Sequence, residues 1–459
     1  MIDDTIAAIA TGMTDAGVGI IRVSGEDSID IVDKIFRSPS GVSLNDAAGY
    51  TIHYGHIYDD DIILDEVLVS IFRAPGSFTG ETTCEINCHG GMYILNKTLE
   101  LVIKNGCRLA EPGEFTKRAF LNGKLDLTKA ESVMDLIASK NDFALKNSMK
   151  NLKGDIYKCI LNLRERILYE IAHIESAIDD PEHFDMTDYP DYLRGVIKVI
   201  NDEIKRLIIN ARDGRILKDG ILTVIVGKPN AGKSSFLNLL SGNDRAIVTS
   251  KAGTTRDVLE ESVRLGSYVL NLVDTAGIRE TEDEIESIGV DKAREYIERA
   301  DLVLYMVDSS VALDDNDRDI AALLNDKKTI VLMNKSDLDA VVTTDMICNM
   351  LGYNTYIVNI SAKENTGIDD FKNTVDLLFG NESFNFNDEV VITNTRQINE
   401  LNKADESLRN VIESIDNGMP EDFYSIDLKD AYEHLGFIIG EEIDDDVADE
   451  IFSKFCMGK

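Results

Sequence analysis

The sequence GKPNAGKS at Gly227–Ser234 decides the class of fold that we predict. The apolar, β-branched run Ile221–Val226 precedes it, and a helix-like segment, Ser235–Leu240, follows it. A strand, a glycine-containing loop and a helix in this order distinguish a phosphate-binding loop from a chance match. Gly227 and Gly232 let backbone N–H groups approach phosphate oxygens, and the helix N-terminus adds partial positive charge. We therefore expect a nucleoside-phosphate site at this loop.

Metal and phosphate chemistry follows from side chains in and after the loop. We expect Lys233 to reach the β- and γ-phosphates and Ser234 to bind Mg²⁺. Thr254 and Thr255, in the string AGTTRD, can offer a second hydroxyl, and we assign Thr255 as the other Mg²⁺ ligand. The string DTAG at 274–277 ends a predicted strand, so that its carboxylate can hold the hydration shell of the metal.

Two further motifs predict a pocket for guanine. The string NKSD at 334–337 ends the predicted strand Thr329–Met333, and Asp337 can accept from both N–H groups on the guanine edge, which adenine does not supply. The string SAK at 361–363 offers a backbone amide to guanine O6. Five such motifs in order at strand ends predict a GTP-binding domain. The predicted nucleotide-binding residues are Asn230, Ala231, Gly232, Lys233, Ser234, Ser235, Thr249, Ser250, Lys251, Ala252, Gly253, Thr254, Thr255, Asp274, Thr275, Ala276, Gly277, Asn334, Lys335, Asp337, Ser361, Ala362 and Lys363.

The hydrolytic machinery must differ from that of Ras-like enzymes, because Ile278 stands where those enzymes have a water-orienting glutamine. The side-chain carbonyl of Asn230, with backbone carbonyls of the loop at 249–254, can surround a monovalent cation. Glu286 can then orient the attacking water. The alternatives are that Asn230 is only a turn residue after Pro229 and that Glu286 is a solvated acid at a helix start.

Composition limits the remaining possibilities. The chain has 459 residues, enough for two to four domains, and 44% of them are hydrophobic. It has no apolar run long enough to span a membrane, and its acidic N-terminus does not resemble a signal peptide, so we expect a cytoplasmic protein. Six scattered cysteines are typical of reduced thiols, and Cys84 and Cys88 are better explained as strand cysteines than as zinc ligands. A net charge of −36 disfavours simple nucleic-acid binding, so an RNA substrate would need a local basic patch or a basic partner.

Four segments are predicted along the chain, and together they give a multidomain α/β plus α fold. Residues 1–120 are predicted to form an α/β domain, 121–218 the first part of a helical domain, 219–380 a Ras-like P-loop GTPase domain, and 381–459 the second helical part. The GTPase is therefore an insertion in the helical domain. An apolar stripe from Leu145 to Ile178 repeats every 3.67 residues on average, which predicts one long, nearly straight helix ended by Asp179-Asp180-Pro181.

The whole chain resembles the MnmE (TrmE) family of tRNA wobble-uridine modification GTPases. The similar strings include DTIAAIA at 4–10, GIIRVSG at 19–25, APxSFTGE at 74–81, HGG at 89–91, PGEFTxRAFLNGKxDL at 112–127 and the terminal CMGK at 456–459. The resemblance implies that the first domain dimerises and binds a reduced one-carbon folate through Arg22, Glu81, Lys124 and Lys459. It also implies K⁺ bound by Asn230, Thr249, Lys251 (through its carbonyl) and Thr254, with Glu286 as the catalytic glutamate and Cys456 as a second candidate catalytic residue.

The resemblance further implies a function. The protein would be a potassium-dependent GTPase that, with an FAD-containing MnmG-like partner in a heterotetramer, adds an aminomethyl or carboxymethylaminomethyl group to C5 of the wobble uridine of certain tRNAs. The alternative is a ribosome-assembly GTPase similar to Era or Der, although the sequence has neither a Gly-x-x-Gly RNA clamp after the GTPase nor a second phosphate loop. Two departures from the family are Lys251, where an apolar residue is frequent, and Thr83-Cys84, where Asp-Val is more usual. Whether Cys456 is a nucleophile or a redox bystander stays open.

Overall fold

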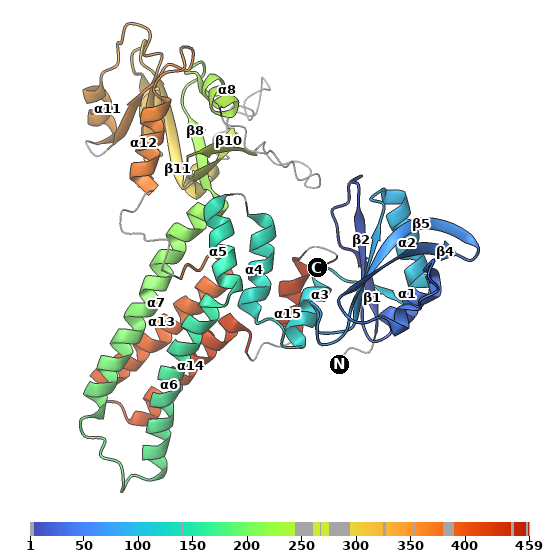
Figure 1. The fold of residues 1–459 in the computed structure, drawn as a ribbon. Helices are drawn as coiled ribbons and strands as arrows, with labels where there is room; N and C mark the ends of the chain where they lie inside the picture. Colours follow the sequence, from blue (N-terminus) through green and yellow to red (C-terminus); the bar gives the residue numbers. More distant parts are fainter. Residues whose placement is uncertain are drawn as a thin grey trace, which may run out of the picture. The chain divides into compact units, whose positions relative to one another are not determined.

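The computed structural model describes residues 4–139, 141–243, 260–266, 268–274, 294–324, 327–352, 355–379, 390–441, 445–455 and 458. The chain divides into two compact units. The first comprises Met1–Ala138, Asn147–Lys205 and Asn399–Lys459, and the second comprises Ser139–Lys146 and Arg206–Ile398. The secondary structure elements of both units are labelled in Figure 1.

A mixed sheet begins the first unit, in the strand order β3-β4-β5-β6-β2-β1-β7. Its neighbouring strands pair antiparallel except for β1 and β7, which are parallel. Two helices, α1 and α2, pack their apolar side chains against the sheet in one core that includes Ile21, Val69 and Leu101. The strands are β1 (Ile6–Ile9), β2 (Gly19–Ser24), β3 (Phe36–Arg37), β4 (Thr51–Asp59), β5 (Ile62–Phe72), β6 (Thr83–Cys88) and β7 (Arg108–Leu109), and the helices are α1 (Ser28–Ile35), the 3₁₀ helix η1 (Leu44–Asp46), α2 (Met92–Lys104) and α3 (Glu114–Leu121).

The helical part of the first unit packs long helices side by side (Figure 1). Arg164 on α6 contacts the Tyr432 carbonyl of α14, and Asn201 on α7 donates to the Asp405 carbonyl of α13. Leu127, Phe452 and Phe455 form a smaller apolar cluster that joins α4 to the C-terminal segment. The helices are α4 (Leu127–Ala138), α5 (Asp142–Leu152), α6 (Asp155–Asp179), α7 (Tyr189–Asp219), α13 (Thr395–Asp416), α14 (Glu421–Ile439) and α15 (Asp445–Ser453).

The prediction of one long helix through the apolar stripe was wrong. The chain forms α5 and α6 instead, and Gly154 between them has φ of 92°, a left-handed conformation that a continuing helix does not contain. Left-handed glycines end helices because they lack a Cβ that would clash with the backbone. The stripe is also not buried along its whole length, since Leu145 and Met149 are 46% and 40% exposed. The predicted end of the helix at Asp179 is confirmed.

The second unit contains a sheet with strand order β13-β12-β11-β8-β10-β9. All neighbouring strands are parallel except β9 and β10, which are antiparallel. Apolar clusters include side chains from opposite faces of the strands, such as Leu304 in one and Val303 in the other. The elements are β8 (Ile221–Val226), α8 (Lys233–Asn243), β9 (Glu260–Leu265), β10 (Tyr268–Asp274), β11 (Leu302–Asp308), α10 (Asp315–Ala322), β12 (Thr329–Asn334), α11 (Thr344–Leu351), β13 (Tyr356–Asn359) and α12 (Ile368–Phe379). The predicted fold class, an α/β GTPase domain inserted in a helical domain that follows an α/β domain, is confirmed.

Candidate functional site

The loop between β8 and α8 has the close contacts expected of a phosphate cradle. A Cβ added to Gly227 would lie 2.3 Å from the Met306 carbonyl oxygen, and one added to Gly232 would lie 2.0 Å from Nδ2 of Asn334. Both glycines have positive φ, 148° and 100°. Side chains are therefore excluded at both positions, and the loop backbone packs directly against β11 and the end of β12. This cradle fits a phosphate chain followed by a helix N-terminus.

Lysines hold the loop from two sides. The Lys233 ammonium donates to the carbonyl oxygens of Gly227 and Lys228, both at 2.8 Å, so it lies across the loop that it is predicted to complete. Lys228 pairs with Asp317 at 2.7 Å and Asp314 at 3.1 Å, which ties the loop to the start of α10. Ser234 and Ser235 are exposed in the first turn of α8.

Asn230 occupies the left-handed region with φ of 62° and is exposed. Asparagine tolerates this conformation better than most residues. The geometry therefore fits both the predicted cation ligand and the simple turn residue.

The base-pocket motifs are joined by Asn334. Its Nδ2 donates to the Ala231 carbonyl at 2.8 Å, and its Oδ1 accepts from the Ala362 amide at 3.1 Å. Ser361 Oγ donates to Asp337 Oδ1 at 2.6 Å, and this hydrogen bond lowers the pKa of Asp337. The phosphate loop and the NKSD and SAK motifs therefore lie together at the carboxyl ends of parallel strands, where open α/β sheets bind ligands.

Lys335 stabilises the same sheet edge through an ion pair. Its ammonium lies 2.6 Å from Asp308 Oδ2 at the end of β11. Burial alone would raise the pKa of Asp308, but hydrogen bonds from Lys335 and Ser310 outweigh it and lower that pKa. The half-buried end of β11 thus carries an ionised carboxylate that holds the NKSD loop.

Several predicted site residues lie outside the described part of the chain. Asp274 ends β10 at the same sheet edge, although only its backbone is described. The other predicted residues outside the described ranges are Thr249, Ser250, Lys251, Ala252, Gly253, Thr254, Thr255, Thr275, Ala276, Gly277, Glu286, Cys456 and Lys459.

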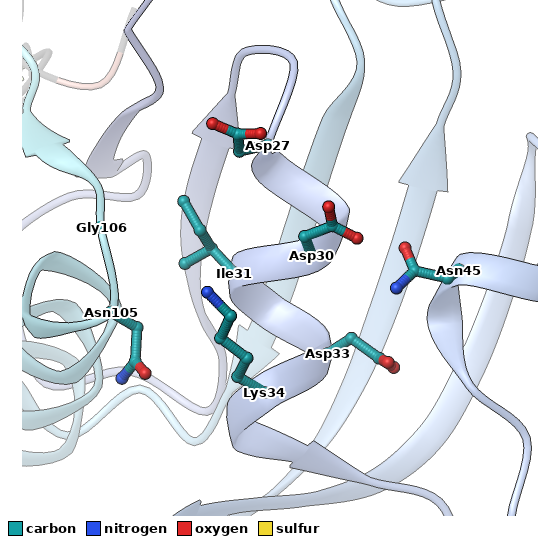
Figure 2. A pocket seen from close by; sticks show the side chains of 8 residues that line it. All are labelled: Asp27, Asp30, Ile31, Asp33, Lys34, Asn45, Asn105 and Gly106. Atoms are coloured by element: carbon teal, nitrogen blue, oxygen red, sulfur yellow. The ribbon is translucent and has the colours of Figure 1, made fainter.

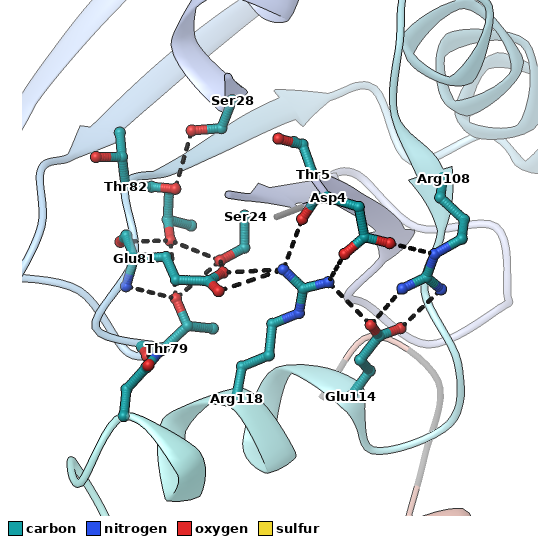
Figure 3. A network of polar contacts seen from close by, with 12 residues as sticks. Asp4, Thr5, Ser24, Ser28, Thr79, Glu81, Thr82, Arg108, Glu114 and Arg118 are labelled. Carbon is teal, nitrogen blue, oxygen red and sulfur yellow. Dashed lines mark hydrogen bonds and ion pairs between the residues drawn. The ribbon is translucent and has the colours of Figure 1, made fainter. Parts of the chain in front are cut away.

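The folate candidates that are described lie around one loop of the first domain. Glu81 accepts from Ser24 Oγ at 2.8 Å and lies 3.3 Å from the Arg118 guanidinium (Figure 3). Lys124 donates to the Pro75 carbonyl at 3.0 Å, and its stem packs beside Gly80. Arg22 donates to Glu85 at 2.9 Å and to the Gly458 carbonyl at 3.3 Å. Glu81 and Lys124 therefore meet at the loop 75–81, and Arg22 reaches the same loop through Phe78, whose ring centroid lies 5.8 Å from its guanidinium carbon.

Two residues of this region were missed by sequence reasoning. Ser24 is fully buried, and Arg118 is 1% exposed, yet both contact Glu81. The available signal was the i,i+4 spacing of Glu114 and Arg118, which places both on one helix face, where they pair at 3.0 Å.

The described residues contain no group of three or more His, Cys, Asp or Glu that could hold a metal ion. Cys84, Cys88 and Cys107 are buried, and burial raises the pKa of each thiol to about 12. These cysteines are therefore neutral core residues, and Cys84 and Cys88 lie on β6, as strand cysteines that are more deeply buried than expected.

A separate cavity of about 520 Å³ lies beside α1, lined by Asp27, Asp30, Ile31, Asp33, Lys34, Asn45, Asn105 and Gly106 (Figure 2). None of the predicted site residues lines it. Asp33 is already engaged there, since it accepts from Ser43 Oγ and from the Leu44 amide.

The phosphate loop and the guanine-pocket motifs at one sheet edge define a P-loop GTPase. Residues 5–124 match the family model of the GTP-binding protein TrmE N-terminus, and residues 127–456 match that of the MnmE helical domain. The chain belongs to the MnmE family of tRNA modification GTPases.

Curated relatives support the same assignment. A protein of Lachnoclostridium phytofermentans named tRNA modification GTPase MnmE is 50% identical over 457 residues, covering 99% of each chain. Proteins of the same name from Geobacillus kaustophilus and Clostridioides difficile are each 44% identical. The match covers 99% of both chains for the first and 100% of both chains for the second. Among solved structures, Aquifex aeolicus Era with GDP and AlF₄⁻ matches 41% of this chain and 66% of its own at 28% identity, with a TM-score of only 0.29.

Within the described residues, no helix is both long and apolar enough to cross a membrane.

Proposed function

We propose that this protein hydrolyses GTP in order to modify the wobble uridine of certain tRNAs. With an FAD-containing, MnmG-like partner it would add an aminomethyl or carboxymethylaminomethyl group to C5 of that base. The observation that carries the proposal is the 50% identity, over 99% of both chains, to a relative named tRNA modification GTPase MnmE. We also propose three domains in four segments: an α/β domain at 1–120, a GTPase domain at 219–380, and a helical domain in two parts at 121–218 and 381–459.

The nucleotide site supports GTP as the substrate. Asp337 keeps an ionised carboxylate at the pocket edge, and the Ala362 amide is fixed by Asn334 at 3.1 Å. The fixed Asp337 acceptor matches the N–H edge of guanine, and the bond from the Ala362 amide to Asn334 holds the SAK motif beside it. When Mg²⁺ is bound, Ser234 and Thr255 would hold it, and the ion would neutralise charge on the phosphates.

Potassium is proposed as the second cation, held by Asn230, Thr249, Lys251 and Thr254. The exposure of Asn230 in the phosphate loop is compatible with this, because no packing contact removes its side-chain carbonyl from solvent. When K⁺ is bound it supplies positive charge beside the transferring phosphate. Glu286 would orient the attacking water, so Glu286→Ala should lower kcat and leave GDP affinity nearly unchanged.

A reduced one-carbon folate is proposed to bind near the loop at 75–81. The donor set fits such a ligand, since Arg22 and Lys124 are cations and Glu81 is a carboxylate with a side chain 19% exposed. The carboxylate can accept from the N–H edge of a pterin, and the cations can pair with its glutamate tail. The contact of Arg22 with the Gly458 carbonyl supports a role for the chain end, including Lys459, in covering the ligand.

Cys456 lies two residues before Gly458 in the sequence, and the Gly458 carbonyl accepts from Arg22. We propose that its thiol takes part in the modification. Cys456→Ser should then bind 5-formyltetrahydrofolate and fail to modify tRNA. Full modification by this variant would remove the thiol from the mechanism and leave folate binding intact.

A homodimer is proposed on the basis of an exposed sheet face. Ile52 and Tyr54 on β4 point to the same side, and Leu68 on β5 lies directly opposite Tyr54. These side chains are 66%, 48% and 45% exposed. A contiguous apolar surface of this kind is typical of a protein interface.

The decisive experiment is nucleoside mass spectrometry of tRNA from a deletion strain. The proposal predicts loss of the modified wobble uridine and its return on complementation. Unchanged wobble uridines together with immature ribosomal subunits would instead support the ribosome-assembly alternative.

A further inference from the structure

One buried arginine holds three carboxylates in the first domain. The Arg118 side chain is 1% exposed and donates to Asp4 Oδ1 at 2.6 Å and to Glu114 Oε1 at 3.0 Å. Its NH1 group donates to the Asp4 carbonyl at 2.8 Å and lies 3.3 Å from both oxygens of Glu81 (Figure 3). A planar guanidinium presents its N–H groups in a fixed fork, so these contacts set the plane of the Glu81 carboxylate.

The charge of the cluster is not balanced. Asp4, Glu81 and Glu114 contribute three carboxylates, whereas Arg108 and Arg118 contribute two guanidinium groups. Arg108 engages Asp4 at 2.6 Å and Glu114 at 2.5 Å, so both of those carboxylates bind two guanidinium groups. Glu81 contacts only one, at the longer distance of 3.3 Å. The uncompensated negative charge therefore lies mainly on Glu81.

The rest of Glu81 is equally constrained. Its Oε2 accepts from Ser24 Oγ at 2.8 Å, and its backbone carbonyl accepts from Ser77 Oγ at 2.5 Å. Ser24 is fully buried on β2, and its hydroxyl is held in place by Thr79 Oγ1 at 2.8 Å. The Glu81 side chain is nevertheless 19% exposed, and Oε1 has only the Arg118 contact among the hydrogen bonds described for it. One acceptor position of a fixed, negatively charged carboxylate is thus left for a ligand.

We propose that Arg118 is a positioning residue that orients Glu81 for the N–H edge of a pterin. This inference rests on the folate site proposed above and extends it to a residue beneath the binding surface. The Arg118 side chain is 1% exposed and that of Glu81 is 19% exposed, so Arg118 acts through Glu81 and does not touch the ligand. Preorganisation of a charged acceptor raises affinity because the ligand does not pay for ordering it.

The test is titration of the full-length protein with 5-formyltetrahydrofolate. R118Q should weaken binding about 30-fold, because a charged hydrogen-bond partner of the acceptor is lost. R108Q is the matched control: it removes the other guanidinium of the same cluster, which contacts Asp4 and Glu114 but not Glu81. R108Q should stay within about threefold of wild type. Circular dichroism and thermal unfolding check that each variant is folded. If R118Q does not fold, R118K replaces it, because lysine keeps the buried charge.

A double-mutant cycle separates positioning from general structural support. In an E81Q background, R118Q (or R118K) should change folate affinity by less than about threefold, because its effect passes through the Glu81 carboxylate. If the Arg118 substitution weakens folate binding just as much in the E81Q background, the inference is wrong. It is also wrong if R118Q and R108Q lose equal folate affinity. In both cases folate binding by the wild type still supports the folate site. Absence of folate binding by wild type would overturn both.

Discussion

Asp337 shows at the scale of one residue how a carboxylate selects a base. Ser361 donates to one of its oxygens at 2.6 Å and leaves the other oxygen, with the remaining lone pairs, for guanine. Asp337→Asn puts an amide donor against the guanine N–H groups, so we expect GDP affinity to fall about 100-fold. The same amide can donate to the 2-carbonyl of xanthine, so XDP affinity should rise.

Calorimetric titration with GDP and XDP checks this prediction. Asp339→Asn is the matched control, since Asp339 is an exposed aspartate two residues further on. Equal GDP affinity in wild type and Asp337→Asn would refute the assigned role.

His89 gives a second prediction at this scale, through pH. Its backbone N–H donates to Asp65 Oδ2 at 2.8 Å, and its Nδ1 lies 2.6 Å from Oδ1 of the same buried carboxylate. The hydrogen bond to Asp65 raises the pKa of His89 above 6.5. A raised folded-state pKa means that the stabilisation is complete below pH 6.5 and is lost as the pH rises through the raised value.

His89→Gln should therefore lower the midpoint of thermal unfolding more at about pH 6 than at about pH 9. Unfolding curves of both proteins at the two pH values measure the difference. A larger loss at the higher pH would contradict the pairing with Asp65.

At the scale of elements, the break between α5 and α6 predicts the sign of a change in stability. Gly154→Ala places a Cβ on a residue with φ of 92°, so we expect it to destabilise the protein by about 1–2 kcal/mol. A continuous helix through the same residue would predict the opposite, because alanine is the better helix former.

Gly195 supplies the matched control for this change. It lies inside α7, and a Cβ there would meet no atom within 4 Å. Gly195→Ala should stabilise the protein by about 0.5–1 kcal/mol. Chemical denaturation of both variants measures the sign of each change in the free energy of unfolding. Stabilisation by Gly154→Ala would support the single long helix instead of two.

At the scale of the whole molecule, the exposed face of β4 and β5 predicts the oligomeric state. Leu68→Glu places a charge opposite Tyr54, so we expect the proposed dimer to dissociate into monomers. Tyr93→Glu is the control, since Tyr93 is 74% exposed on α2, which packs on the other face of the sheet. Sedimentation velocity gives the masses. A monomeric wild type, or a dimer unaffected by Leu68→Glu, would count against this interface.

The proposed potassium requirement also concerns the whole molecule, because it is expected to depend on association of two GTPase domains. We expect kcat to be about 100-fold higher in K⁺ than in Na⁺ at equal ionic strength. Asn230→Gly keeps the left-handed turn and removes the side-chain carbonyl, so it should abolish the difference. Retained K⁺ stimulation in Asn230→Gly would mark Asn230 as a turn residue only.

The GTP site could be read from the sequence because its chemistry is local. The GKPNAGKS loop, the NKSD motif and the SAK motif each follow a strand, and parallel strands bring their carboxyl ends to one edge. The order of these motifs along the chain therefore determined the class of site. The folate candidates came from family resemblance, which named Arg22, Glu81 and Lys124 without their contacts.

Tertiary structure alone decided three features. The apolar period from Leu145 to Ile178 continues across Gly154, so only the backbone conformation revealed two helices. The Arg118 cluster joins Asp4, Glu81 and Glu114, and the contact with Glu81 spans 37 residues of sequence. The chain end reaches Arg22 across 436 residues. Periodicity and motifs report interactions between near neighbours in sequence. A buried charge is instead balanced by the charged and polar groups that the fold places around it. Its partners are therefore visible only in three dimensions.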